Sequence, residues 1–364
     1  MRVLITYVSA GGGHRRVAEA VHGYLKDNRQ DLSLELVDLL PFADPFFRFC
    51  YICGYPFLVH YATWLWGFFF WMTEFKLTRW FSRKIARIMN YFSCRKFIRY
   101  LEVENFDFII STHFLNSELA SNLKLKNKIK SKLVTVITDF GVHPFWISKG
   151  TDIYIAASRA TKDKLLTLGV EASKIKDSGI PFASNFIRNQ DRVALASKLG
   201  IQPNMFTVLL MTGSFGLGPL EEIAQDISTV AQVLVVCANN RALFSRLRKK
   251  NLNNVKVFGF INNAEELMAV SDIIITKPGG SSIAELINME LFPIFICAIP
   301  GQEKENIRIL AACCAVGYAP RNIKQINQLI VDLKNNPEKF QGLKNNIVAA
   351  AKPFACRELA SVIR

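Results

Sequence analysis

Several motifs that commonly mark nucleotide or metal sites are missing from this sequence. The first glycine stretch, at residues 11–14, has neither the GxGxxG spacing of a dinucleotide turn nor the lysine of a Walker loop, which disfavours both kinds of site. The eight cysteines lack the paired CxxC and histidine spacing of a zinc site, so we expect them to be reduced. No Asp-x-Asp pair ends a predicted strand, and we expect no catalytic metal and no other cofactor.

Acidic residues are also scarce. There are 30 Asp and Glu residues against 45 Lys and Arg, which gives a formal net charge of +15. Such a basic surface attracts polyanions, either anionic lipid or nucleic acid. The mean hydropathy of +0.18 is high for a soluble enzyme, so membrane contact is expected to be part of the function. Residues 1–2 lead directly into an apolar run, from which we expect no signal peptide and a cytosolic chain.

Short apolar runs alternate with helical segments along the 364 residues, a length that suits two domains. The alternation predicts an α/β fold of two Rossmann-like, doubly wound domains that face a cleft. We place them at residues 1–190 and 191–350, with a separate final segment at 351–364. The predicted strands are residues 3–8, 34–39, 108–112, 133–138 and 153–157, then 207–211, 233–237, 255–258, 273–276 and 293–297.

The alternation breaks at residues 42–100, where an aromatic and basic insert begins. Residues 49–73 contain no Asp, Glu, Lys or Arg, which meets the length criterion for a membrane-spanning helix. A single crossing would, however, split one sheet across the bilayer, because strands precede and follow the insert. We therefore predict an insert lying on an anionic membrane surface. The alternative is a core helix with a solvated basic face. The membrane-contacting candidates are Trp64, Trp66, Phe69, Trp71, Arg79, Arg83, Lys84 and Arg87.

The segment 276–306 organises the second half of the chain. A strand ends in Gly279 and Gly280, and Ser281 or Ser282 can begin a helix, which together favour a phosphate site at the helix N-terminus. A plain strand–helix corner is the alternative. Glu285 lies one turn into the helix, where a carboxylate suits ribose hydroxyls better than phosphate. After the next strand, Gln302 and Glu303 are placed to read sugar hydroxyls.

Two titratable residues follow strands in the first half. His14 begins the helix after the first strand, where the helix dipole favours a neutral imidazole that accepts a proton. The alternative is a histidine that only caps or packs. Asp139 follows the strand at 133–138 and should lie at the carboxyl edge of the sheet, with His143 and Trp146 in the loop beyond it.

These motifs resemble those of one known family. They are Gly11-Gly12-Gly13-His14, Thr138-Asp139 with His143 and Trp146, Ser178-Gly179-Ile180-Pro181, Gly213-Ser214-Phe215-Gly216, Lys277-Pro278-Gly279-Gly280 with Glu285, and Pro300-Gly301-Gln302-Glu303 with Asn306. In this order they resemble the GT-B glycosyltransferases that use UDP-sugars, in the branch of monogalactosyldiacylglycerol synthases and processive diacylglycerol glucosyltransferases.

The resemblance implies transfer of a hexose from UDP-glucose or UDP-galactose to diacylglycerol, with inversion, at the cytoplasmic face of a membrane. Uracil would lie near Phe260 and Ile261, and the final helix, at 357–363, would cross back to the first domain. The leaving diphosphate would be stabilised by N–H and hydroxyl hydrogen-bond donors of Gly213, Ser214, Gly279, Gly280 and Ser281. Gly12 and Gly13 would face the acceptor beside His143 and Trp146. Both His14 and Asp139 remain candidates for the base that deprotonates the acceptor.

Two other functions compete with this one. A GlcNAc transferase acting on a peptidoglycan lipid intermediate shares the fold, but its acid-Gln-Asn run is replaced here by residues 138–143. A non-catalytic basic protein that binds lipid or RNA is the other. RNA binding favours aromatics on an exposed sheet or in a basic groove rather than a continuous uncharged aromatic insert, so we expect no nucleic-acid partner.

Overall fold

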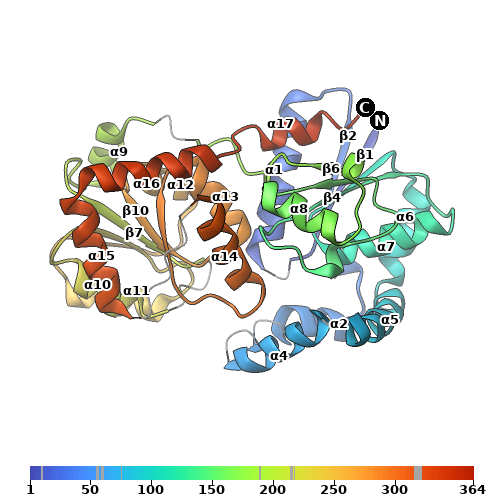
Figure 1. Cartoon of the computed structure of the whole chain (residues 1–364), viewed down its shortest axis with the longest axis horizontal. Coiled ribbons are helices and arrows are strands. Elements are labelled where there is room, and N and C mark those ends of the chain that lie inside the picture. The colour runs from blue at the N-terminus through green and yellow to red at the C-terminus, as the bar shows by residue number, and fades with distance from the viewer. Residues whose placement is uncertain are drawn as a thin grey trace. The chain divides into compact units, whose positions relative to one another are not determined.

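The computed structural model describes residues 1–9, 11–54, 57–58, 61–74, 76–187, 190–213, 216, 218–314 and 322–364. The chain forms two compact units (Figure 1). The first unit comprises Met1–Ser184, Ile299–Asn306 and Phe354–Arg364, and the second comprises Asn185–Ala298 and Ile307–Pro353. Compared with the predicted boundaries, the main difference is that residues 299–306 group with the first unit.

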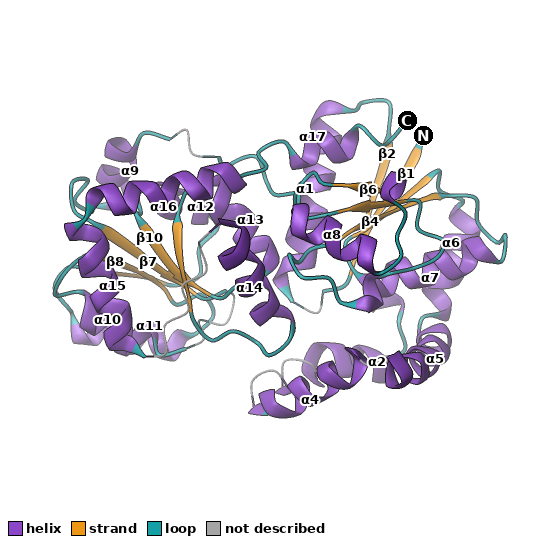
Figure 2. Ribbon diagram, viewed as in Figure 1, coloured by secondary structure: helices purple, strands orange, loops and turns teal. Residues whose placement is uncertain are grey.

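The first unit is built on a six-stranded parallel sheet in the order β2-β1-β3-β4-β5-β6 (Figure 2). All five predicted strands are present with ends shifted by at most two residues. Four of them are largely buried apolar runs, as is typical of parallel strands, whereas the edge strand β2 is only partly buried. The short β6 was not predicted. The strands are β1 (Arg2–Tyr7), β2 (Ser33–Asp38), β3 (Phe108–Ser111), β4 (Lys132–Val136), β5 (Ile153–Ile155) and β6 (Ile175–Lys176).

The register of this sheet confirms the topological argument about the insert. Val3 of β1 pairs with Leu34 of β2 on one side and with Phe108 of β3 on the other. The strands before and after the insert therefore flank β1 in a single sheet. Because all strands run in parallel, the ends of β1, β3 and β4 meet at one edge of the sheet.

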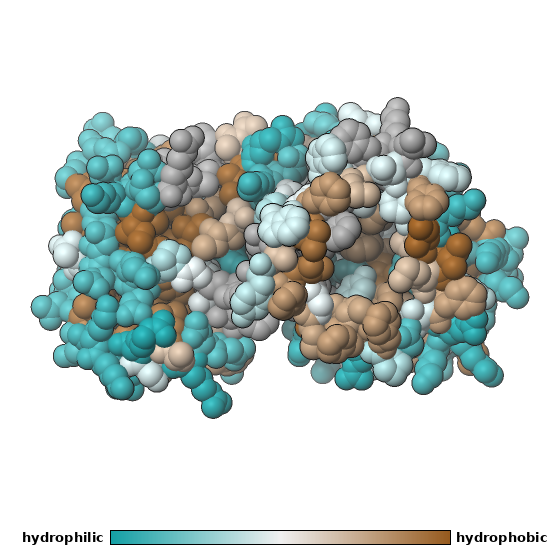
Figure 3. Space-filling view, turned by 90° about the horizontal axis from the view of Figure 1, so that it is seen from below, coloured by the Kyte–Doolittle hydropathy of each residue, from teal (hydrophilic) through white to brown (hydrophobic). Residues whose placement is uncertain are grey.

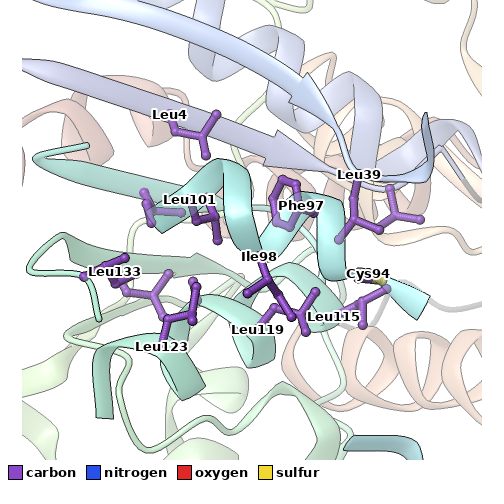
Figure 4. Packing of buried hydrophobic residues seen from close by; sticks show 14 of the residues in the cluster. Leu4, Leu39, Cys94, Phe97, Ile98, Leu101, Leu115, Leu119, Leu123 and Leu133 are labelled. Carbon is purple, nitrogen blue, oxygen red and sulfur yellow. The ribbon is translucent and has the colours of Figure 1, made fainter. Parts of the chain in front are cut away.

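Helices from the insert and from the rest of the first unit cover this sheet. Figure 4 shows Phe97 and Leu101 of α6 packed with Leu4, Leu115 and Leu133 in one buried cluster. The helical segments are α1 (Gly12–Asn28), η1 (Leu40–Phe42), α2 (Pro45–Phe49), η2 (Cys50–Gly54), α4 (Thr63–Glu74), α5 (Lys76–Ser93), α6 (Arg95–Glu104), α7 (Phe114–Leu125), η3 (Pro144–Trp146), α8 (Arg159–Thr167), η4 (Ala172–Lys174) and α17 (Ala355–Ala360).

The two long insert helices before α6 differ from it in exposure. α5 contacts α6 and α7, yet its apolar stripe faces away from the core: Trp80 is 62% exposed and Phe81 is 61% exposed. Figure 3 looks at the molecule from the side of α4 and α5, and hydrophobic side chains gather on that face. In the part of the chain that the structure describes, no helix is both long and apolar enough to cross a membrane.

The second unit repeats the pattern with a five-stranded parallel sheet in the order β11-β10-β7-β8-β9. Three of its strands coincide with the predicted bounds, and the other two begin one residue earlier than predicted. The strands are β7 (Thr207–Met211), β8 (Gln232–Val236), β9 (Val255–Phe258), β10 (Ile273–Thr276) and β11 (Phe292–Phe295). The helices are α9 (Arg192–Leu199), α10 (Leu220–Ile227), α11 (Arg241–Lys250), α12 (Ala264–Ala269), α13 (Gly280–Asn288), α15 (Ile323–Asn335) and α16 (Pro337–Ala350), while α14 (Gln302–Cys314) begins in the first unit.

The C-terminal helix belongs to the first unit. α17 packs against α1, and the thiol of Cys356 lies 3.4 Å from the carbonyl oxygen of Phe182. The helix that the sequence predicted at residues 357–363 thus begins and ends slightly earlier, at Ala355–Ala360.

Candidate active site

The turn after β1 positions His14. Gly11 caps α1 with a φ of 129°, a conformation that side chains other than glycine rarely adopt. Gly12 and Gly13 form the start of α1, and no side chain caps this helix. His14 therefore lies in the first turn of α1, beside the end of β3.

Two threonines that follow neighbouring strands hold the imidazole of His14. Its Nδ1 lies 2.8 Å from the carbonyl oxygen of Thr112 and 2.9 Å from the hydroxyl oxygen of Thr138. A carbonyl oxygen can only accept a hydrogen bond, so Nδ1 carries the proton and donates it to Thr112. In the neutral ring, Nε2 is then the nitrogen with a lone pair that can take up a proton.

Burial keeps His14 neutral. The ring lies edge-on to His113, with centroids 4.6 Å apart, and 6.2 Å from the ring of Trp146. Burial lowers the pKa of His14, and this outweighs the charge of Asp139 and the hydrogen bond to Thr112, which both raise it. Burial, followed by the influence of His14, holds the pKa of His113 well below its usual range.

The carboxylate of Asp139 is bonded through both oxygens to the start of α14. Gln302 donates through Nε2 to Oδ2 of Asp139, and Asn306 donates through Nδ2 to Oδ1 at 3.2 Å. The Oδ1 of Asn306 in turn accepts the backbone N–H groups of Phe140 at 2.9 Å and Gly141 at 3.1 Å. Asn306 is fully buried. One side chain thus joins α14 to the turn that presents Asp139.

Competing effects set the ionisation of Asp139. Burial raises its pKa, while the hydrogen bond from Gln302, the charge of His14 and the hydrogen bond from Asn306 lower it. The net direction is upward. Because His14 and Asp139 influence each other, they titrate as a linked pair at the edge of the sheet.

The start of α14 also explains the position of Glu303. Its Oε2 accepts the backbone N–H of Ile299 at 2.8 Å, so the carboxylate folds back over the turn that precedes the helix. Gly301 in that turn has a φ of 87°, which favours glycine. Gln302 and Glu303 were predicted to form hydrogen bonds with sugar hydroxyls. In the structure each already has a partner inside the first unit: Gln302 donates to Asp139, and Glu303 accepts from Ile299.

His143 and Trp146 lie in the loop after Asp139, at η3. The Nδ1 of His143 accepts the N–H of Phe145 at 3.3 Å, and its Nε2 is 3.0 Å from the hydroxyl oxygen of Thr73 in α4. His143 therefore links the loop to the insert. Trp146 is buried in a cluster with Ile137 and other apolar residues, so its role in the described structure is packing beside His14.

In the second unit, the turn after β10 leads into α13. The N-cap is Gly279, no side chain caps the helix, and a Cβ at Gly279 would meet nothing within 4 Å. The predicted start at Ser281 or Ser282 is wrong by one or two residues, because Gly279 already takes the extended N-cap conformation and α13 begins at Gly280. Ser281 and Glu285 are both buried, at 8% and 4% exposure.

The other residues predicted to bind the UDP-sugar follow β7 and β9. Gly213 has a φ of 81°, in keeping with a tight turn at the end of β7, whereas Ser214 lies outside the described residues. The hydroxyl of Thr212 beside Gly213 is buried with no partner among the residues that the structure describes. Phe260 is 64% exposed, and Ile261 is half-buried.

The predicted membrane residues differ in their surroundings. Trp64 and Trp71 of α4 are 74% and 54% exposed, and Lys84 lies over the ring of Trp80. Arg83 and Arg87 instead fasten α5 to the first unit. Arg83 donates to the carbonyl oxygen of Ile147 at 2.6 Å, and Arg87 pairs with Glu118 at 3.5 Å. The side chains of Trp66, Phe69 and Arg79 lie outside the described residues.

No three His, Cys, Asp or Glu side chains in the described ranges are grouped so that they could hold a metal ion. The expectation that catalysis needs no metal or cofactor remains a prediction.

Two residues of this site, Thr112 and His113, were not singled out from the sequence, and Thr138 was named only as part of the Thr138-Asp139 motif. Thr112, His113 and Thr138 contact or surround His14 only because β3 and β4 follow β1 in the sheet. The available signal was the run of polar residues that ends the strand at 108–112, since the ends of neighbouring parallel strands share one edge.

Comparison with known proteins identifies the family. Residues 14–182 match the monogalactosyldiacylglycerol (MGDG) synthase family, and residues 207–355 match the glycosyltransferase family 28 C-terminal domain. A processive diacylglycerol beta-glucosyltransferase of Bacillus cereus is 31% identical over 313 residues, which cover 84% of this chain and 78% of that protein. The chain belongs to this family of glycosyltransferases. A family member of the same name from Staphylococcus epidermidis is 28% identical over 365 residues, 98% of this chain and 91% of its own.

Solved structures agree on the fold of the family member described here. MurG of Acinetobacter baumannii matches with a TM-score of 0.62 at 14% identity, over 100% of this chain and 99% of its own. HepE of Anabaena, solved in complex with UDP, matches with a TM-score of 0.57 at 15% identity and the same coverage. At these identities the likeness concerns the fold alone, which is GT-B as predicted.

Proposed function

We propose that this glycosyltransferase moves glucose from UDP-glucose to diacylglycerol, with inversion, at the cytoplasmic surface of a membrane. The observation that carries the proposal is the state of His14. Its Nδ1 is committed to the carbonyl of Thr112, so the neutral ring offers Nε2 to an acceptor hydroxyl. As the hydroxyl oxygen bonds to the anomeric carbon, its proton passes to Nε2 and the bond to UDP breaks.

Asp139 is better suited to support this base than to be one. Both of its oxygens already accept side-chain amides, and its negative charge raises the pKa of His14. That interaction grows stronger when His14 gains the proton. Asp139 therefore acts by stabilising the imidazolium that forms.

The start of α13 supports the donor part of the proposal. Among the residues that the structure describes, no side chain caps its N-terminal N–H groups, and the positive end of the helix dipole favours the negative charge that develops on the leaving diphosphate. Glu285 lies one turn further on, where a carboxylate suits ribose hydroxyls. HepE is named in complexes with UDP and with UDP-glucose, which supports a nucleotide-sugar donor here.

The names of the relatives support both the sugar and the acceptor. They are diacylglycerol beta-glucosyltransferases, and inversion at the α-linked carbon of UDP-glucose gives a β-linked product. Glucose is therefore a better choice than galactose, which the sequence alone left open.

The exposed insert supports a membrane location. Diacylglycerol resides in a bilayer, and the exposed apolar residues of α4 and α5 offer a surface that enters the headgroup region. Exposed cations of α5 and α6, including Lys84 and Arg99, attract anionic lipid.

The experiment is a transfer assay with purified protein and liposomes that contain diacylglycerol. Labelled UDP-glucose, UDP-galactose and UDP-GlcNAc are supplied separately, and the lipid products are separated by thin-layer chromatography. We expect a glucolipid with UDP-glucose, and the repeat of the assay without diacylglycerol should give none. Preferential use of UDP-GlcNAc, or hydrolysis that ignores the lipid, would refute the proposal.

A further inference from the structure

His113 is a buried titratable residue beside the base, and the proposed reaction does not use it. It lies shortly after β3 and is 4% exposed. Its ring meets that of His14 edge-on, with centroids 4.6 Å apart, and stacks on the ring of Phe114 with centroids 4.3 Å apart. The residue also begins a helix, because its side chain caps α7.

This cap fixes which nitrogen of the His113 ring carries the proton. Nδ1 accepts the backbone N–H of Leu115 at 3.2 Å. An N–H group can only donate, so Nδ1 holds a lone pair, and in the neutral ring Nε2 carries the proton. Burial holds the pKa of His113 well below its usual range, and a proton on Nδ1 would also break the cap. The ring therefore stays neutral and keeps Nε2–H as a hydrogen-bond donor.

The Nε2–H of His113 has no acceptor among the residues that the structure describes. The hydrogen bonds of this residue involve Nδ1, the backbone N–H and the backbone carbonyl. A buried donor without an acceptor costs free energy. The cap does not need this second nitrogen, because asparagine, aspartate and serine cap helices without one. A bound ligand with an acceptor oxygen would supply the missing bond.

The two histidine rings in contact offer opposite kinds of group. His14 offers the lone pair of Nε2, because its Nδ1 donates to Thr112, whereas His113 offers Nε2–H. A ligand that suits both has a hydroxyl that can lose its proton and, close to it, an oxygen that accepts a hydrogen bond. Diacylglycerol has this pair when its acyl chains occupy neighbouring carbons, since the free hydroxyl then lies on the carbon next to an ester.

His113 also connects the base to the insert. Its ring is 4.6 Å from that of His14 and 6.4 Å from that of Tyr51 in η2. Tyr51 in turn stacks on Phe47 of α2, with centroids 4.8 Å apart. Contacting aromatic rings therefore continue from the base into the insert. A lipid that reaches His14 along these rings brings its acyl ester past His113.

We propose that His113 donates Nε2–H to the carbonyl oxygen of the ester beside the free hydroxyl of diacylglycerol, and so selects ester-linked over ether-linked lipid. The inference rests on the proposed function, because it takes diacylglycerol as the acceptor and His14 as the base. His113 keeps its proton throughout. Its bond to the ester holds the neighbouring hydroxyl against Nε2 of His14.

The first test compares kcat/KM for dioleoylglycerol with that for its dioleyl ether analogue, which lacks the carbonyl oxygens, in liposomes with saturating UDP-glucose. The wild type should prefer the ester at least fivefold, which corresponds to about 1 kcal/mol, the net contribution of a neutral hydrogen bond. His113→Asn keeps a cap for α7 and removes Nε2, so the preference should disappear. His113→Gln can place an amide N–H near the position of Nε2 and should retain part of it.

The matched control is Ser158→Asn, which also exchanges one helix cap for asparagine, at the start of α8. It should keep the wild-type preference. A preference that survives in His113→Asn, or that falls equally in the control, would overturn the inference. A defect that lowers the rates with both lipids together leaves their ratio unchanged, and would assign His113 a structural role only.

The second test does not depend on transfer. In proton–nitrogen NMR spectra of the full-length protein labelled at histidine, the Nε2–H signal of His113 is identified by its absence from His113→Asn. It should move downfield when soluble dihexanoylglycerol is added, and should not move with the dihexyl ether analogue. A signal that stays in place, or moves equally with the ether, would refute the bond to the ester. A shift with the ester in a protein that forms no glucolipid would count against the proposed function and leave the binding role of His113 intact.

Discussion

Asn306→Ala tests how the turn that carries Asp139 is held. Among the described residues, the Asn306 side chain makes three buried hydrogen bonds: it accepts from Phe140 at 2.9 Å and Gly141 at 3.1 Å, and it donates to Asp139 at 3.2 Å. A neutral hydrogen bond contributes about 1 kcal/mol net, and a bond to a charged group about 1.5–3 kcal/mol. Removal of all three should therefore destabilise the turn by on the order of 3–5 kcal/mol, and the pKa of Asp139 should rise further.

The effect can be read locally through amide hydrogen exchange. The two backbone bonds protect Phe140 and Gly141, and their loss should lower the free energy of local opening by about 2 kcal/mol, which speeds exchange about thirtyfold. Asn345→Ala is the control, because Asn345 is exposed on α16 and its side chain accepts a surface bond from Gln341. Unchanged exchange at both amides in Asn306→Ala would refute the reasoning, as would the same change in the control.

Three further predictions concern the donor, the base and the insert. Glu285→Ala should weaken UDP binding itself, whereas Gln302→Ala should impair UDP-glucose more than UDP; calorimetry that finds equal losses of UDP affinity would contradict this division. Burial lowers the pKa of His14 below its usual 6.5. The neutral imidazole, which is the form that accepts a proton, is therefore lost only when the pH falls through this lowered pKa. The acid limb of the kcat/KM profile should lie below pH 6.5, and a limb above it would assign the base elsewhere. Trp80→Ser/Phe81→Ser should weaken flotation with anionic liposomes about a hundredfold, at about 1.5 kcal/mol or more for each aromatic side chain, with UDP binding retained; a protein that also loses UDP binding would mean that these residues are core.

Most of the strands could be predicted closely because they are buried and nearly continuously apolar, although the edge strands β2 and β9 are only partly buried. The runs at 207–211, 255–258 and 273–276 coincide with β7, β9 and β10. β6 was missed because it has two residues, and only its pairing with β5 defines it as a strand. The start of α13 was misplaced because serine is a common N-cap, whereas here the glycine before it takes that conformation.

The site could be predicted only in part. His14 was identified because it begins the helix after the first strand, and Asp139 because it follows a predicted strand directly; both are local properties of the sequence. The contact of Nδ1 of His14 with Thr112 spans 98 residues, and that of Asn306 with Asp139 spans 167. Such contacts depend on strand order and on where α14 begins, which no local pattern encodes. The exposure of Trp80 and Phe81 likewise distinguishes α5 from the buried α6, although both have amphipathic sequences.

The most direct measurement of the central claim is the rate at which His14→Ala transfers glucose from labelled UDP-glucose to diacylglycerol in liposomes. General base catalysis contributes about 10²–10⁴-fold to a rate, so kcat should fall by at least a hundredfold while UDP affinity, measured by calorimetry on the same protein, stays within twofold of the wild type. A variant that keeps its kcat would contradict the assignment of His14 as the base, and a wild-type protein that forms no glucosyl-diacylglycerol would contradict the proposed reaction itself.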